Sequence, residues 1–167
     1  MNAIKKQKLG TWLTLVVIIL GIVSVIIYSV NGSVEGYFKG TNQSSVVIMS
    51  VLAIVFAVVS IILAQFSANG AAGKILSAIT DILRIAAAVL LIASLMGFVS
   101  TRVEGLGYIF GSDENVLDEI QTEENMRSAY TAIAGFAFYA VTWLVALVAC
   151  FLSLIHISEP TRLRCIS

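Results

Sequence analysis

Long apolar stretches alternate with short polar segments along this chain. An α-helix needs about 20 apolar residues to cross the roughly 30 Å hydrocarbon core of a bilayer, and each apolar stretch is close to that length. The stretches are Trp12 to Val30, Val46 to Phe66, Ile82 to Val99 and Ala129 to Phe151. The pattern predicts an all-α fold, a four-helix transmembrane bundle, with spans at about residues 11–30, 45–67, 75–100 and 126–151.

The second stretch, Ser45 to Ser67, has no ionisable residue, and its small side chains recur at alternating steps of three and four. This spacing places them on one face of a helix. A small-residue face lets a neighbouring backbone approach closely, which is how membrane helices commonly pack. With one glycine of the fourth stretch, the expected helix-packing seam is Ser50, Ala53, Ala57, Ser60, Ala64 and Gly135.

The longest polar segment, residues 101–127, follows the third stretch. It opens with the Gly-punctuated aromatic sequence GLGYIFG at 105–111, which we interpret as a loop that docks a partner or folds over the end of the bundle. Ser112, followed by two acids, is typical of a helix start, and Thr122 is expected to cap the fourth span. Apolar Val116 and Leu117 then give a short amphipathic helix in this third, outer loop. The candidate interaction residues are Gly105, Gly107, Tyr108, Phe110, Asp113, Glu114, Asp118 and Glu119.

Two further patterns in the polar segments have simple explanations. The acidic cluster at 113–124 lacks the spaced oxygen ligands and the central glycine of a calcium loop, so helix capping and solvation account for it better than a cation site does. Asn31 and Asn42 begin formal glycosylation sequons, which arise readily by chance in a loop rich in Ser and Asn.

Asp81 and Arg84 are three residues apart, so they share a helix face and can pair. We expect them within the first turns of the third span, near the membrane surface. There they either fix the depth of the helix or serve function by gating a pathway or contacting a lipid headgroup. Five basic residues (Lys5, Lys6, Lys8, Lys74, Arg84) fall on one side of the membrane and three (Lys39, Arg102, Arg127) on the other. This bias predicts a cytoplasmic N-terminus.

Composition supports a multi-pass membrane protein, because 59% of the residues are hydrophobic and only 12% are charged. Ten basic residues balance ten acidic ones, so nucleic acid is not an expected partner. The apolar cores of the spans lack the ionisable group that coupled transporters usually place near the midplane. Since the chain also lacks a catalytic or metal-binding constellation, we expect no enzyme activity, cofactor or metal.

The last residues look foreign to the rest of the chain. Leu152 to Arg162, LSLIHISEPTR, resembles the translation of the transposon-end adapter used in tagmentation sequencing libraries. We therefore expect residues 1–151 to form a single four-span domain and residues 152–167 to be an artefactual tail. The only His and the only Pro of the chain belong to that tail.

In size and layout, and in the text RVEGLGYI at 102–109, the chain resembles small four-span integral membrane proteins of Gram-positive anaerobes. The resemblance brings no activity with it and implies a bacterial plasma membrane. We expect a non-catalytic accessory or scaffold component that presents the outer acidic loop. The alternative is a small transporter or pore formed by self-association. The expected partners are the lipid bilayer and either another membrane protein or a second copy of the chain.

Overall fold

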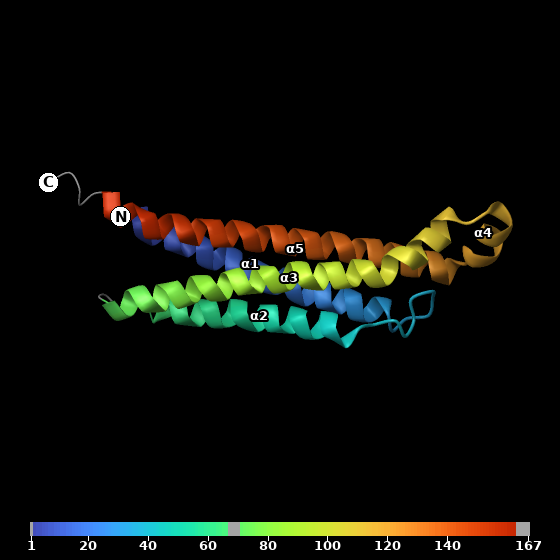
Figure 1. The fold of residues 1–167 in the computed structure, drawn as a ribbon, viewed down its shortest axis with the longest axis horizontal. Coiled ribbons are helices and arrows are strands. Elements are labelled where there is room, and N and C mark those ends of the chain that lie inside the picture. The colour runs from blue at the N-terminus through green and yellow to red at the C-terminus, as the bar shows by residue number, and fades with distance from the viewer. Residues whose placement is uncertain (1, 67–70, 163–167) are drawn as a thin grey trace.

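The computed structural model describes the backbone of residues 2–66 and 71–162, and the side chains of residues 10–66 and 73–152. Within these ranges the chain is helical, without a strand (Figure 1). The helices are α1 (Asn2–Asn31), α2 (Ser44–Gln65), α3 (Ala71–Gly111), α4 (Glu114–Ile120) and α5 (Glu123–Arg162). The all-α prediction is confirmed. A short helix, α4, lies in the segment expected to form one, but none of its residues is fully buried, so its amphipathic character stays a prediction.

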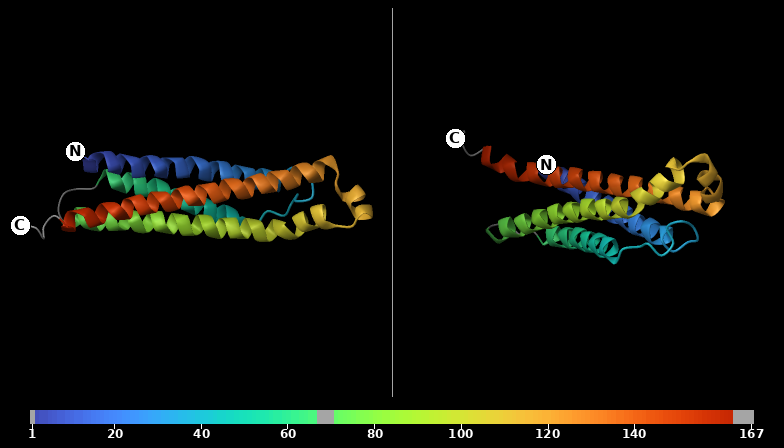
Figure 2. Two further views of the ribbon diagram at one scale, coloured as in Figure 1. Left: turned by 90° about the horizontal axis from the view of Figure 1, so that it is seen from above. Right: turned by 45° about the vertical axis from the view of Figure 1, so that its right-hand side comes forward.

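The four long helices pack alongside one another. α2 lies against α3, α1 against α5, and α3 also contacts α5, as the views in Figure 1 and Figure 2 show. Loop 32–43 and α4 lie together at one end of the bundle, which we call the α4 end, and both chain termini lie at the opposite end. This arrangement is what an even number of membrane crossings requires.

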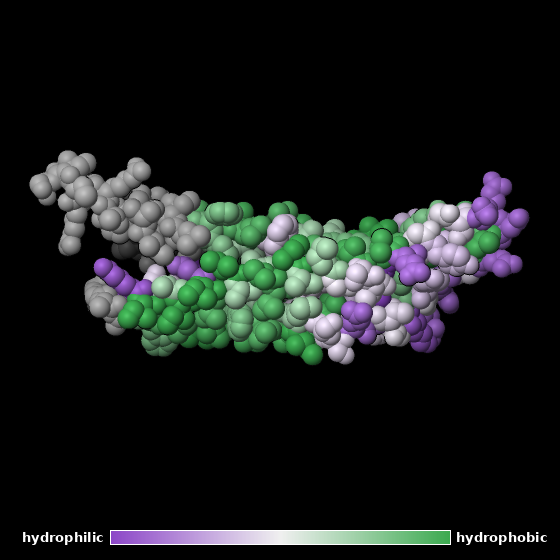
Figure 3. All heavy atoms as spheres, in the orientation of Figure 1, coloured by the Kyte–Doolittle hydropathy of each residue, from purple (hydrophilic) through white to green (hydrophobic). Residues whose placement is uncertain are grey.

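Four helices are long and apolar enough to span a membrane: Gly10–Asn31, Ser44–Gln65, Gly73–Gly111 and Glu123–Leu152. Figure 3 shows an apolar surface along the middle of the bundle and polar residues gathered at the α4 end. Large side chains such as Ile48, Val89 and Leu144 point outward and are half exposed. These features fit an integral membrane protein that is surrounded by lipid.

The expected loop at Gly105–Gly111 is wrong, because α3 continues as a helix through Gly111. With 41 residues α3 is about 60 Å long, well beyond the thickness of a bilayer core. Gly105 is buried against Tyr37 and Phe38, and a Cβ at this position would come within 2.5 Å of atoms in both rings. This glycine therefore serves close packing inside a helix, and the packing outweighs its poor helix propensity.

The two expected helix starts have different outcomes. Ser112 does not cap α4, because its hydroxyl donates to the carbonyl of Tyr108 and so belongs to the end of α3. Asp113 occupies the N-cap position of α4 without a side-chain cap hydrogen bond. Thr122 does cap α5, since its Oγ1 accepts from the backbone N–H of Asn125 at 3.3 Å.

The interior has an aromatic half and a small-residue half. Toward the α4 end, Phe98 is the centre of an aromatic cluster, with ring centroids 4.7 Å from both Tyr28 and Phe136. The other cluster consists mainly of small or aliphatic residues: Val17, Ala53, Ala87, Ala88, Leu91, Ala146 and Cys150. The first half fills its space with large rings, whereas the second lets the backbones approach more closely.

Hydrogen bonds join the helices across this interior. Ser24 of α1 bonds Thr142 of α5 at 3.2 Å, and Ser50 of α2 bonds the Tyr139 hydroxyl of α5 at 2.8 Å. Each pair satisfies two buried polar groups that lipid would leave without partners.

The residues of the predicted seam lie mostly at helix contacts. Ser50, Ala53, Ala57 and Ser60 are at most 2% exposed, while Ala64 is partly exposed. Gly135 is buried under Phe98, whose ring atom Cε1 would lie 2.5 Å from an added Cβ. The seam therefore packs helices of one chain against each other.

The helix α5 continues past Phe151 to Arg162. The side chains of the adapter-like tail after Leu152, and the whole of residues 163–167, lie outside the described part of the chain. The adapter interpretation stays a prediction.

Leucine at Ala57 or Gly135 is expected to destabilise the bundle by about 1–3 kcal/mol, because both positions lack room for a larger side chain. Leucine at the outward-facing Val55 or Val141 is the matched control and is expected to be nearly silent. Thermal unfolding of the four variants in detergent measures the difference. Equal tolerance at both classes of position would contradict the seam.

Candidate functional site

The most unusual side chain at the α4 end is Arg102, which is 0% exposed although it carries a charge. Its Nε donates to Oδ1 of Asn31 at 2.9 Å, and its Nη2 donates to Oδ1 of Asn42 at 2.9 Å. Its Nη1 donates both to the carbonyl of Thr41, at 3.1 Å, and to the hydroxyl of the same residue. We call this group of four residues the Arg102 clasp.

Aromatic rings surround the guanidinium group of the clasp. Its central carbon lies 5.0 Å from the ring centroid of Phe38, 5.6 Å from that of Tyr28 and 5.8 Å from that of Phe98. Burying a cation costs a large desolvation free energy unless hydrogen bonds replace its water. Here neutral oxygens and ring faces replace the water.

The clasp connects four segments of the chain. Asn31, the last residue of α1, also donates from Nδ2 to the carbonyl of Ser128 on α5, at 2.7 Å. Asn42, the penultimate residue of loop 32–43, donates from its amide to the carbonyl of Ser29 at 3.2 Å. Arg102 therefore holds α1, α3, α5 and the loop before α2 in one arrangement. Since Asn31 is 2% exposed and uses both ends of its amide, this fold leaves no room for a glycan there.

The sequence prediction placed Arg102 among the basic residues flanking the bundle and missed its burial. A signal was present in the spacing, because the buried stripe of α3 continues through this position in steps of three and four. The stripe is Ala87, Leu91, Ser94, Phe98, Arg102, Gly105 and Ile109. The apolar part of this stripe ends at Phe98. Hydropathy alone therefore predicts that the helix leaves the membrane there, just before Arg102, and gives no sign that Arg102 is buried.

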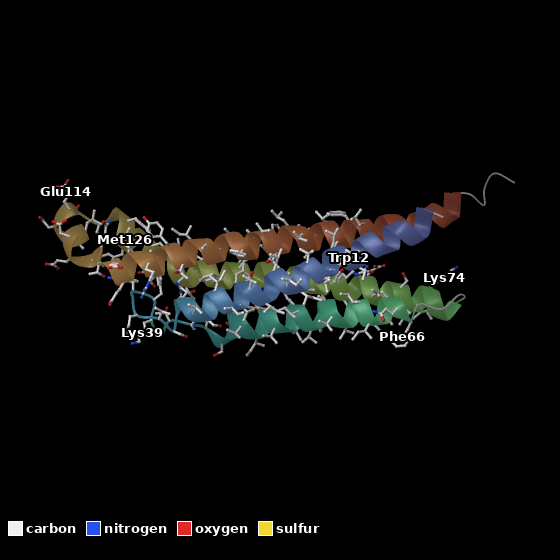
Figure 4. All side chains as sticks on the ribbon, turned by 180° about the vertical axis from the view of Figure 1, so that it is seen from behind. Trp12, Lys39, Phe66, Lys74, Glu114 and Met126 are labelled. Carbon is white, nitrogen blue, oxygen red and sulfur yellow. The ribbon has the colours of Figure 1, made fainter. Side chains whose placement is uncertain are left out.

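Beyond the clasp, residues 103–127 form a helical projection that we call the acidic hairpin. At its base Ile109 is 0% exposed and belongs to the buried core cluster of the bundle. Within the hairpin, Gln121 donates to the Ile109 carbonyl at 3.0 Å and Asn125 donates to the Ile120 carbonyl at 2.8 Å. Figure 4 shows Glu114 at its tip, with Met126 and Lys39 at the same end of the molecule. The exposed acids of the hairpin are Glu104, Asp113, Glu114, Asp118, Glu119, Glu123 and Glu124.

The other expected interaction residues are divided between surface and interior. Tyr108 and Phe110 are nearly half exposed and lie 6.2 Å, between ring centroids, from Tyr37 and Tyr130 respectively. Gly107 is exposed, whereas Gly105 is buried. In the part of the chain that the structure describes, the acidic, Cys and His side chains do not gather in a group of three that could hold a metal ion.

Asp81 and Arg84 lie far from this site, toward the opposite end. Arg84 Nη1 is 3.7 Å from Asp81 Oδ1, and both side chains are about nine-tenths buried. Asp81 lies about three turns after the start of α3 at Ala71, deeper along the helix than the expected first turns.

Comparison with known proteins finds no matching family model, no similar curated protein and no similar solved structure. The resemblance carried by RVEGLGYI therefore stays a prediction.

Replacing Arg102 with Met keeps much of its volume but removes the four hydrogen bonds that the guanidinium donates. We expect a loss of at least about 3 kcal/mol in the free energy of unfolding, because the oxygens of Asn31 and Asn42 lose a charged donor. Lys74→Met, at an exposed site, is the control and is expected to change little. Unfolding in detergent measures both variants, and equal stability would contradict a structural role for the clasp.

The pairing of Asp81 with Arg84 predicts non-additive mutations. Asp81→Ala alone leaves a mostly buried guanidinium without this carboxylate, so it should lower the folded fraction more than the double change Asp81→Ala/Arg84→Ala. A detergent-resistance assay on both single variants and the double variant gives the coupling. Strict additivity would show that the two residues do not interact.

Proposed function

We propose that this protein is a non-catalytic component of the plasma membrane that presents its acidic hairpin to a basic surface of another membrane protein. The observation that carries the proposal is the contrast between a firmly anchored base and a fully displayed acidic helix. No residue of α4 is fully buried, whereas Ile109 belongs to the buried core cluster of the bundle and Gln121, in the same hairpin, donates to its carbonyl.

The charge distribution gives the chemistry of the partner. The α4 end holds eight acidic residues against three basic ones, and one of the three, Arg102, is buried inside the clasp. Such a surface attracts a basic partner over a range set by ionic strength. The exposed rings of Tyr108 and Phe110 beside the acids supply apolar contact area of the kind found at interface centres.

The orientation in this proposal follows the positive-inside rule, with the N-terminus in the cytoplasm and the α4 end outside. Exposed Lys74 lies at the opposite end from the acidic hairpin, as Figure 4 shows. The charge bias supports an extracytoplasmic binding surface.

A small transporter or pore formed by self-association is the alternative function. The main support for self-association was the small-residue seam. Ser50, Ala53 and Ala57 of this seam are buried in contacts between helices of one chain and are therefore not exposed to a second copy. In the described interior, the polar pairs Ser24–Thr142 and Ser50–Tyr139 satisfy each other. Packing of this kind favours a closed bundle over a conducting one.

The test is a pulldown in mild detergent with the full chain as bait. We expect a stoichiometric foreign partner whose retention falls with salt and is lost when Glu114, Asp118 and Glu119 are changed to Gln, Asn and Gln. The control is Lys74→Gln, which removes an exposed charge at the opposite end of the bundle and should leave the partner bound. A clean homo-oligomer that conducts ions in liposomes would replace this proposal with the pore.

A further inference from the structure

A cavity of about 260 Å³ opens at the α4 end, where α1 ends and α5 begins. Two opposite charges line it, the carboxylate of Glu35 from loop 32–43 and the guanidinium of Arg127 from α5. Asn31, Ser128 and Thr131 add polar groups, and two valines, Val30 and Val34, add an apolar side. The proposed partner function uses none of these residues.

Ser128 gives this cavity the character of an unfilled polar site. Its side chain is 6% exposed, and its buried hydroxyl lacks a hydrogen-bond partner within the described residues. A buried hydroxyl without a partner is unfavourable and calls for an explanation. A ligand atom in the cavity that accepts a hydrogen bond would satisfy it.

Gly36 fixes the loop over this serine. Its φ is +141°, a conformation that L side chains rarely adopt, and an added Cβ would lie 2.7 Å from both the Glu124 carbonyl oxygen and Ser128 Cβ. Only glycine allows the loop to approach α5 so closely. Because Glu35 is the neighbouring residue, this contact holds its carboxylate beside the cavity.

The cavity adjoins an open groove of about 630 Å³ on the surface of α1 and α5, and the two share Arg127 and Thr131. The groove reaches Ile27 of α1 and Ala134 of α5, each about one turn closer to the middle of the membrane-spanning helices. It therefore runs from charged groups at the helix ends onto an apolar surface. A lipid shows the same order, with a polar headgroup followed by apolar acyl chains.

We propose that the cavity binds the headgroup of a phospholipid that carries a primary ammonium group beside its phosphate, with an acyl chain in the groove. Arg127 and the Ser128 hydroxyl donate to the phosphate oxygens, and the ammonium donates to the Glu35 carboxylate. Glu35 also pairs with Lys39, but both are more than half exposed, so the pair is weak and leaves acceptor sites free on the carboxylate.

The test compares lipids with identical acyl chains and different headgroups, added to the full chain in mild detergent. Native mass spectrometry measures retention, and thermal unfolding measures stabilisation. We expect phosphatidylethanolamine to be retained over phosphatidylcholine, whose quaternary ammonium cannot donate. We also expect it to be retained over phosphatidylglycerol, which offers Glu35 no cation. Equal retention of all three would overturn the proposal.

Variants assign the contacts. Arg127→Gln should weaken phosphatidylethanolamine binding about tenfold, while Lys74→Gln at the opposite end should not. Glu35→Gln should abolish the preference over phosphatidylglycerol. Ser128→Ala should weaken binding without lowering the stability of the lipid-free protein, because the hydroxyl has no hydrogen-bond partner to lose among the described residues. Wild-type binding in all three cavity variants would overturn the proposal.

A soluble zwitterion has the same headgroup chemistry as the lipid, so a further comparison distinguishes the two ligands. Glycerophosphoethanolamine carries the same headgroup without acyl chains. We expect it to protect the protein far less than the lipid at equal concentration, because the groove stays empty. Equal protection would assign the cavity to a soluble ligand and overturn the lipid.

Discussion

The buried guanidinium of Arg102 is the constraint on which the α4 end depends. A cation can be held away from water only if nearly all of its donors are satisfied, so its neighbours have little freedom. Asn31, Thr41 and Asn42 must occupy fixed positions, and through them the end of α1 and the whole of loop 32–43 are fixed. An apolar side chain at position 102 would pack against the same rings without specifying where the loop lies.

The cavity and the acidic hairpin both adjoin this clasp. Asn31 connects the clasp to α5, because its amide donates to the Ser128 carbonyl. Asn31 and Ser128 also line the cavity, together with Glu35 and Arg127. On the other side of Arg102, Gly105 and Ile109 continue the buried stripe and carry α3 up into the acidic hairpin. Headgroup cavity and hairpin therefore share one rigid foundation, so a lipid bound in the first would stabilise the base of the second.

Sequence patterns predict the apolar half of this protein well and its polar half poorly. Four spans and the small residues facing other helices follow from hydropathy and helical spacing, because lipid imposes a simple rule on which side chains face it. Gly105 and Arg102 were misassigned for the opposite reason. From sequence alone, a glycine indicates a turn and an arginine indicates a charge on the surface. The rings that pack on them, Tyr37 and Phe38 on Gly105 and Phe38 on Arg102, are distant in sequence. Loop 32–43, which supplies those rings, has no periodic pattern that predicts its path.

The two ends of the bundle differ in how much side-chain order they demand. Ala53, Ala87 and Ala146 contribute side chains without rotamers to the cluster nearer the termini, so close approach of the backbones accounts for much of the packing there. The α4 end orders Tyr28, Phe38 and Phe98 around a cation, which costs conformational entropy and yields specificity of geometry. This entropy cost is expected where side chains must be held in a defined arrangement. The side-chain order of the α4 end therefore supports the proposal that recognition takes place there.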